Sequence, residues 1–108
     1  MKLHILGSGT CVPNTRRGSS GYVLEFEKSI ILLDCGNGTT WKLGMVGVDY
    51  LKVDHIFITH FHPDHTADLI PFLFATKYPH PTRFREKPLV IWGPKGFIDF
   101  YSSLKTAY

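Results

Sequence analysis

The chain has 108 residues, of which 44% are hydrophobic and 14% aromatic, enough for one small hydrophobic core. Its formal net charge of +3 is compatible with a polyanionic ligand and does not require one. No apolar run approaches the length of a membrane span, and only six residues precede the first glycine, too few for a signal peptide. We therefore expect one cytoplasmic domain over residues 1–108, without membrane contact and with Cys11 and Cys35 as free thiols.

Three strands are predicted in the first third of the chain. The first covers Lys2 to Gly7, and a hairpin then joins Tyr22–Phe26 to Ile30–Asp34, because both arms are apolar. Residues 7–21 lie between them and are too rich in Gly, Ser and Pro to be anything but a loop. The Gly7-Ser8-Gly9 opening suggests a dinucleotide loop, but the third glycine is not at the required spacing and no helix is predicted to follow.

The second hairpin arm ends in a carboxylate, Asp34, directly before a glycine-rich stretch. A charge at the end of a buried strand needs a partner. Asp34 therefore either supports a neighbouring site or caps the helix predicted over Thr39 to Val46. The large apolar residues of that helix are expected to be ordinary packing residues: Trp41, Leu43 and Met45.

The most informative stretch, residues 59–65, reads Thr-His-Phe-His-Pro-Asp-His and follows a predicted strand over Asp54–Thr59. The predicted metal ligands are His60, His62, Asp64 and His65. The first three point the same way if the segment is extended, and the fourth comes round as the chain turns. Imidazole and carboxylate without cysteine suit zinc first, with manganese or iron as alternatives. The competing interpretation, histidines that only cap the next helix, is disfavoured by three of them beside a carboxylate.

The last part of the chain predicts a buried helix, a strand and a second helix. The first helix covers Thr66 to Tyr78, with Phe72 and Phe74 in the core. The strand covers Leu89–Trp92, and Gly93-Pro94-Lys95-Gly96 turns into the last helix, from about Phe97. A basic connection is interpreted as a solvated loop rather than a phosphate contact: Lys77, Arg83, Arg85 and Lys87.

The pattern His60-x-His62-x-Asp64-His65 after an apolar strand resembles the defining motif of the metallo-β-lactamase fold hydrolases. The resemblance implies that His60 and His62 bind one zinc ion, and that Asp64 and His65 bind a second. It also implies that Asp34, in a Leu-x-Asp-x-Gly setting, supports the ligand loop. Asp64 would in addition accept or relay the proton of the attacking water.

Four phrases in order are similar to the ribonuclease Z branch of that family, the zinc phosphodiesterases that remove 3′ trailers from precursor tRNA. They are Leu6-Gly-Ser-Gly-Thr, Leu33-Asp-Cys-Gly-Asn-Gly-Thr, the ligand loop and Gly93-Pro-Lys-Gly. The resemblance implies an endoribonuclease acting on RNA, and Arg16 and Arg17 in the glycine-rich loop are candidate phosphate contacts. Pro63 stands where that branch usually has glycine. A hydrolase of a small phosphodiester, ester, lactam or cyclic nucleotide is therefore the alternative.

The family fold is an αββα sandwich of two halves, and the resemblance covers only the N-terminal half. It implies an α/β fold with a mixed sheet and helices on one face. Each metal would then receive two ligands from these residues, where a catalytic zinc normally keeps three. We therefore expect weak metal binding and little activity from this chain alone. The uncovered sheet face predicts association with a missing C-terminal half or a second copy, and a non-catalytic half-domain is the third alternative.

Overall fold

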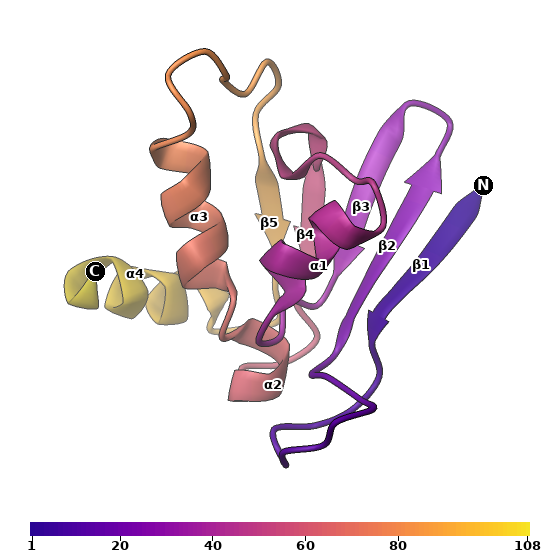
Figure 1. Ribbon diagram of the computed structural model, residues 1–108. Helices are drawn as coiled ribbons and strands as arrows, with labels where there is room; N and C mark the ends of the chain where they lie inside the picture. Colours follow the sequence, from indigo (N-terminus) through magenta and orange to yellow (C-terminus); the bar gives the residue numbers. More distant parts are fainter.

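A five-stranded mixed sheet lies at the centre of the computed structural model, which describes residues 1–108 (Figure 1). The strands lie in chain order across the sheet: β1 (Lys2–Gly7), β2 (Gly21–Phe26), β3 (Ser29–Leu33), β4 (His55–Phe57) and β5 (Val90–Trp92). The helices are α1 (Thr39–Met45), the 3₁₀ helix η1 (Tyr50–Lys52), α2 (Pro63–Thr66), α3 (Leu69–Lys77) and α4 (Phe97–Ala107). None of these helices is both long and apolar enough to span a membrane.

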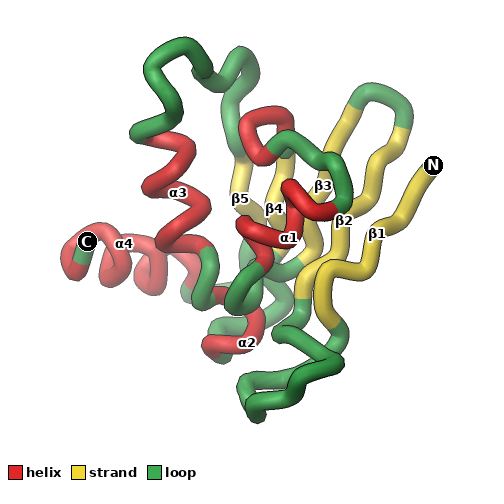
Figure 2. Tube along the Cα trace, viewed as in Figure 1, coloured by secondary structure: helices red, strands yellow, loops and turns green.

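The pairing of the strands decides where functional side chains can meet. β1, β2 and β3 are antiparallel neighbours, whereas β3, β4 and β5 are parallel. Parallel neighbours require crossover connections, which here run through α1 and η1 and then through α2 and α3. The carboxyl ends of the parallel strands therefore meet at one end of the sheet, near α2 and the glycine-rich loop. The connection between α3 and β5 lies at the other end (Figure 2).

The helices share one core against one face of the sheet, as the sequence predicts. Val23, Leu32 and Ile56 are directly paired across β2, β3 and β4 and are fully buried. Leu43 of α1 and Phe72 of α3 cover them and are also fully buried. Figure 1 shows α1 and α3 in front of this face. Alternation along the strands therefore sends every second side chain into this core.

The opposite face of the sheet is apolar and has no covering layer. Ile5 is 65% exposed and Trp92 49% exposed, and Leu3 and Phe57 are also exposed. The rings of Phe57 and Trp92 stack with centroids 5.7 Å apart. The uncovered apolar face expected from the sequence is therefore present.

Two expectations about helix packing are wrong. Trp41 is 75% exposed and Met45 is also exposed, because Thr39 and Leu43, one turn apart, fill the inner side of α1. Phe74 is exposed on α3 for the same reason. The predicted helix over 66–78 is also divided: α2 ends at Thr66, and α3 begins at Leu69.

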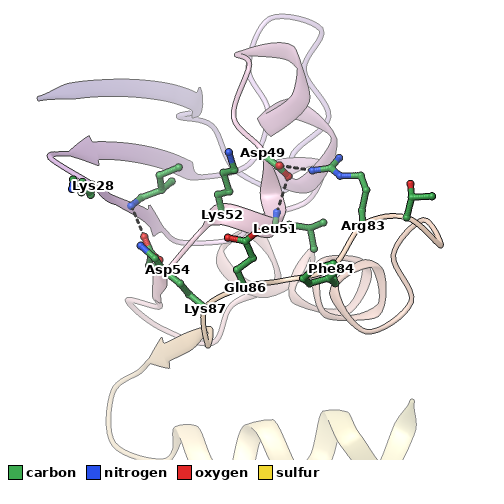
Figure 3. A pocket seen from close by; sticks show the side chains of 11 residues that line it. Lys28, Asp49, Leu51, Lys52, Asp54, Arg83, Phe84, Glu86 and Lys87 are labelled. Carbon is green, nitrogen blue, oxygen red and sulfur yellow. Dashed lines mark hydrogen bonds and ion pairs between the residues drawn. The ribbon is translucent and has the colours of Figure 1, made fainter.

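The connection between α3 and β5 is largely exposed, as expected, and two of its arginines tie it to η1 and Asp49. The Arg85 guanidinium donates to the carbonyl oxygens of Val53 and Tyr50, at the end of η1. Arg83 forms an ion pair with Asp49 (Figure 3). Partial burial lowers the pKa of Arg85, although nearby carboxylates oppose this. These two arginines therefore serve the fold and are not free to hold a phosphate.

Candidate metal centre

Three predicted ligands converge at the carboxyl end of the parallel strands. His60 and His62 lie in the segment after β4, and Asp64 lies in the first turn of α2. One ligand atom from each lies within 4.8 Å of the other two. Two ligands of a tetrahedral zinc lie about 3.4 Å apart, since zinc–ligand distances are about 2.1 Å. The donor set therefore fits a zinc ion after a shift of less than about an ångström in each ligand atom.

The chain geometry around Pro63 explains this convergence. His62 is extended, with φ −62° and ψ 148°, and Pro63 occupies the first position of α2. Proline suits that position because its missing N–H has no acceptor there and its φ is already helical. The residue before a proline also favours extended backbone. Asp64 thus meets the two histidines through a helical turn, not through the extended alternation expected from the sequence.

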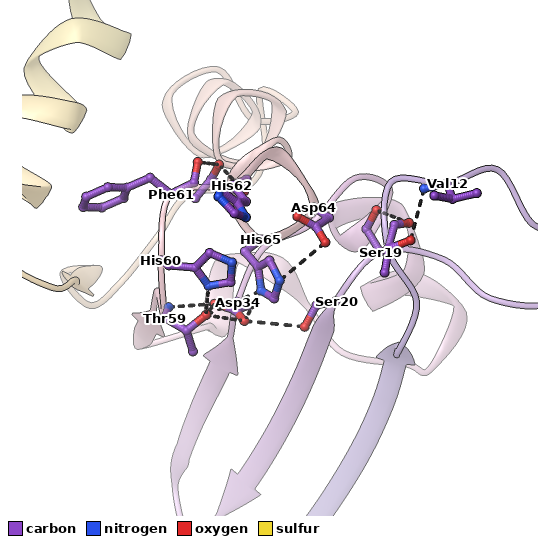
Figure 4. A network of polar contacts seen from close by, with 12 residues as sticks. Val12, Ser19, Ser20, Asp34, Thr59, His60, Phe61, His62, Asp64 and His65 are labelled. Atoms are coloured by element: carbon purple, nitrogen blue, oxygen red, sulfur yellow. Dashed lines mark hydrogen bonds and ion pairs between the residues drawn. The ribbon is translucent and has the colours of Figure 1, made fainter.

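His65 lies beside this group and is close to both Asp64 and His60. Its Nε2 atom is 3.5 Å from Oδ2 of Asp64, and its ring centroid is 4.0 Å from that of His60 (Figure 4). The carboxylate of Asp64 is therefore near both the His60–His62 pair and His65. The four side chains therefore lie together, with the His65 ring against that of His60 (Figure 4).

Asp34 is the buried anion behind these ligands. It is 4% exposed, and its backbone has φ 59°, a left-handed conformation that aspartate tolerates better than most residues. Its carboxylate accepts hydrogen bonds from the backbone N–H of Thr59 at 2.8 Å and from the Thr59 hydroxyl at 2.9 Å. It also accepts from Nδ1 of His65 at 2.6 Å. Asp34 therefore holds the residues that carry the ligand loop, and it does not cap α1, whose N-cap is Gly38.

This network assigns the ring proton of two histidines. A carboxylate only accepts, so His65 must donate to Asp34 from Nδ1. The Thr59 hydroxyl has one hydrogen, which it gives to Asp34, so its oxygen accepts from Nδ1 of His60 at 3.0 Å. In the neutral rings, Nε2 of both histidines is then unprotonated and available as a metal ligand.

Two residues of this framework were missed by the sequence analysis. Thr59 was assigned only to a strand, although it links Asp34 to His60. Asp68 was assigned to a helix, but its buried carboxylate accepts from the backbone N–H groups of Gly38 and Thr40 and so fixes the start of α1. Its partners are 28 and 30 residues away in the chain. In the sequence, the only hint of such contacts is an aspartate at the end of a buried strand, before a glycine-rich stretch, as at Asp34.

Backbone contacts hold the residues that follow β3 against the first turn of α2. The N–H of Cys35 donates to the carbonyl oxygen of His65 at 2.8 Å. A Cβ atom on Gly36 would lie 2.2 Å from the carbonyl oxygen of Asp64, so only glycine permits this approach. Burial raises the pKa of the Cys35 thiol, and Asp68 and Asp34 raise it further. The fully buried thiol is not among the converging ligand atoms.

Arg16 and Arg17 lie in the glycine-rich loop, on the side of it that faces α1. Asn14 fixes their backbone, because its side-chain oxygen accepts from both N–H groups. Both arginines line a groove between this loop and α1 and form no ion pair. The structure shows no contact between either arginine and the four predicted ligands. Their expected role as phosphate contacts stays a prediction.

Comparisons with known proteins agree with this architecture. The family model described as the metallo-beta-lactamase superfamily matches residues 14–103. The chain is 33% identical to a ribonuclease Z from Methanothermobacter thermautotrophicus over 96% of its length, which is 33% of that protein. It superposes on the metallo-beta-lactamase fold protein YhfI from Bacillus subtilis with a TM-score of 0.81 and 28% identity, covering 94% of this chain and 41% of that one.

A second solved structure is similar over nearly the whole chain. The human tRNase Z, short form, superposes with a TM-score of 0.80 and 32% identity, covering 99% of this chain and 40% of the human protein. The chain spans about a third of the length of the curated relatives that it matches, and it corresponds to their N-terminal part. The fold is therefore a partial domain of this architecture, as the sequence predicts.

Proposed function

The chain belongs to the metallo-beta-lactamase superfamily, and from this premise we propose that it carries the metal-binding half of a zinc-dependent phosphodiesterase of ribonuclease Z type. The observation that carries the proposal is the convergence of His60, His62 and Asp64 beside His65. The similarity to proteins named ribonuclease Z makes RNA, and precursor tRNA in particular, the substrate that we propose. Because the chain spans about a third of those relatives, we propose that cleavage requires further residues beyond these 108.

The ligand residues would divide as the family resemblance implies. His60 and His62 would hold one ion, and Asp64 and His65 a second. Bound zinc supplies a Lewis acid at the scissile phosphate and lowers the pKa of attacking water. Asp64 would accept the proton of that water, because its carboxylate lies near both the His60–His62 pair and His65. Asp34 and Thr59 keep the imidazole protons on Nδ1, so that Nε2 faces the ligand group.

The donor set favours zinc over softer or harder metals. Imidazole nitrogens suit zinc, and a single carboxylate completes a set without thiolate. Cys35 is fully buried and its thiol is not among the converging ligand atoms. Each ion receives fewer than three ligands if two are bound. We therefore propose that the chain alone binds zinc weakly and has little activity.

The uncovered face of the sheet supports a partner for this half-fold. The exposed residues lie on one face of the sheet because they alternate along the strands with residues that face the core: Leu3, Ile5, Phe57 and Trp92. Leaving such a surface in water is unfavourable. We propose that either further residues of the same protein or a second copy covers it. Sedimentation of the purified chain distinguishes the two: a dimer supports the second copy, and a monomer supports the missing half.

A chimera tests the catalytic proposal. The corresponding N-terminal third of the Methanothermobacter ribonuclease Z is replaced by this chain, and its thermal melt is compared with that of the parent to verify folding. With zinc, the chimera is expected to cleave a precursor tRNA at its 3′ trailer, and the same chimera with His62→Ala is not. Hydrolysis of a small chromogenic phosphodiester, without cleavage of tRNA, would favour the small-substrate alternative instead.

A further inference from the structure

In a groove close to the ligand loop, all the charged side chains are positive. It lies between the glycine-rich loop and α1, has a volume of about 560 Å³, and contains Arg16, Arg17 and Lys42. No Asp or Glu lines it, and none of these three cations forms an ion pair. Such unpaired charge attracts a polyanion.

The pocket at the opposite end of the sheet provides a contrast. It has a volume of about 420 Å³ and is lined by four cations, but Asp49, Asp54 and Glu86 stand among them. Arg83 pairs with Asp49, and the Lys87 ammonium lies 3.9 Å from Asp54 (Figure 3). Most of that positive charge is neutralised within the protein, so this pocket does not favour a polyanion.

An exposed aromatic ring accompanies the charge of the first groove. Trp41 lines it beside Lys42 and is 75% exposed, although tryptophan is among the side chains that gain most from burial. Packing within the chain does not require this ring, since Leu43 fills the inner side of α1. Exposed aromatic rings next to cations are the means by which proteins bind single-stranded nucleic acid, through base stacking and phosphate pairing.

Residues Gly18 and Ser19 of the glycine-rich loop lie between the groove and the metal centre. A Cβ atom added to Gly18 would lie 2.0 Å from Nζ of Lys42, so this ammonium rests directly on the loop. The next residue, Ser19, packs on Gly36, which itself contacts the backbone of Asp64. Figure 4 shows Ser19 beside Asp64. Two consecutive residues of the loop, Gly18 and Ser19, therefore connect the groove to the ligand loop.

We propose that this groove binds the single-stranded nucleotides next to the scissile phosphate, with Trp41 stacked on a base and Lys42 paired with a phosphate. The inference rests on the proposed function and names the part of the protein that holds the RNA strand. Single-stranded RNA is favoured over a double helix because an exposed ring can stack only on an unpaired, accessible base.

Binding of a short fluorescent single-stranded RNA, measured by anisotropy in EDTA so that no cleavage occurs, tests this proposal on the full chain. Trp41→Ala is expected to weaken binding by about 5- to 150-fold, which corresponds to the stacking of one base. Trp41→Phe keeps a ring and is expected to restore most of the affinity. Lys42→Gln is expected to reduce the salt slope of binding by about one. Lys52→Gln, at the opposite end of the sheet, is the matched control and should bind like the parent chain.

The outcomes separate this inference from the proposed function. The groove is not the RNA site if Trp41→Ala and Lys42→Gln both bind RNA as tightly as the parent chain, or if the parent chain binds no RNA. Either result would stand even if the chimera cleaved precursor tRNA. Loss of binding in these variants, in a chimera that cleaves no phosphodiester, supports the groove and contradicts the proposed catalysis. Thermal melts check the folding of the variants, which is expected to persist because Trp41 is exposed and Lys42 only partly buried.

Discussion

Two aspartates flank the parallel strands β3 and β4 at opposite ends of the sheet. Asp34 follows β3, and its carboxylate accepts from Thr59 and from the His65 ring. Asp54 precedes β4, and its carboxylate accepts from the backbone N–H of Ile30 at 2.9 Å. Both carboxylates fix the chain between the same two strands. Only Asp34 acts on imidazoles that keep a free nitrogen, so the same residue type supports a metal centre at one end and the fold alone at the other.

The chemistry available at each end of the sheet depends on which donor and acceptor atoms there have no hydrogen-bond partner within the chain. At the Asp54 end, Arg85 gives its N–H groups to the carbonyl oxygens of Val53 and Tyr50. At the Asp34 end, hydrogen bonds occupy Nδ1 of His60 and His65 and leave Nε2 free. The hydrogen bonds of Arg85 therefore only hold a loop in place, whereas those to His60 and His65 leave nitrogen atoms that can bind a metal.

Removing a ligand is expected to have the largest effect and to leave the far end unchanged. His62→Ala should lower zinc affinity by more than about 100-fold, since changing a residue behind the ligands already costs 10- to 100-fold. Competition with a chromogenic chelator measures this affinity. His80→Ala is the control, because His80 is bonded only to Thr82 in the connection at the opposite end. An equal loss of affinity in both variants would contradict the assignment of His62.

At the opposite end, Arg85→Met is expected to change stability and not metal binding. The variant leaves the carbonyl oxygens of Val53 and Tyr50 without their charged donor, at a cost of about 2 kcal/mol in the free energy of unfolding. Urea unfolding in EDTA measures this change. Lys28→Met, a nearby cation without an ion pair, should stay within about 0.5 kcal/mol of the parent. Weaker zinc binding in Arg85→Met would break the separation between the two ends.

Removing the Thr59 hydroxyl is expected to have a smaller effect on zinc affinity than removing a ligand. Thr59→Val keeps a β-branched side chain but removes the hydroxyl that links Asp34 to His60. Without this acceptor the proton of His60 is free to move to Nε2, and zinc affinity is expected to fall about tenfold. Thr59→Ser keeps the hydroxyl and should retain the affinity. Parental affinity in Thr59→Val would show that the hydroxyl does not orient His60.

The smallest effect concerns the two thiols. Cys35 is fully buried and its pKa is raised, whereas Cys11 is exposed. Because only the thiolate reacts, alkylation of the native chain near pH 8 should modify Cys11 alone, and Cys11→Ser should be unmodified until urea is added. Mass spectrometry counts the modified thiols. Rapid modification of native Cys35 would mean that the metal end of the sheet opens readily.

The sequence predicted the parts of the metal centre that are close together in the chain. His60, His62, Asp64 and His65 fall within six residues, and a strand before them indicates a shared position at its end. The element order and the uncovered face also follow from alternating apolar residues and from the family resemblance.

What the sequence did not predict depends on contacts between distant residues or on the orientation of a helix. Asp68 fixes the start of α1 from 28 and 30 residues away, and Arg85 reaches the end of η1 across 32 and 35 residues. Trp41 was placed in the core because its helix is apolar, but Thr39 and Leu43 set which side faces inward. Such choices depend on packing against other elements, which periodicity in a short helix cannot decide.

Zinc affinity in three proteins, the parent chain, Asp34→Asn and Asp54→Asn, tests the central claim most directly. Asparagine tolerates the left-handed backbone of Asp34, but its amide can donate toward Nδ1 of His65 and so moves the ring proton to Nε2. We predict that Asp34→Asn lowers the affinity by about 10- to 100-fold, whereas Asp54→Asn lowers only the stability. Equal affinities in Asp34→Asn and the parent chain, or an equal loss in both variants, would contradict the claim that Asp34 orients the metal ligands.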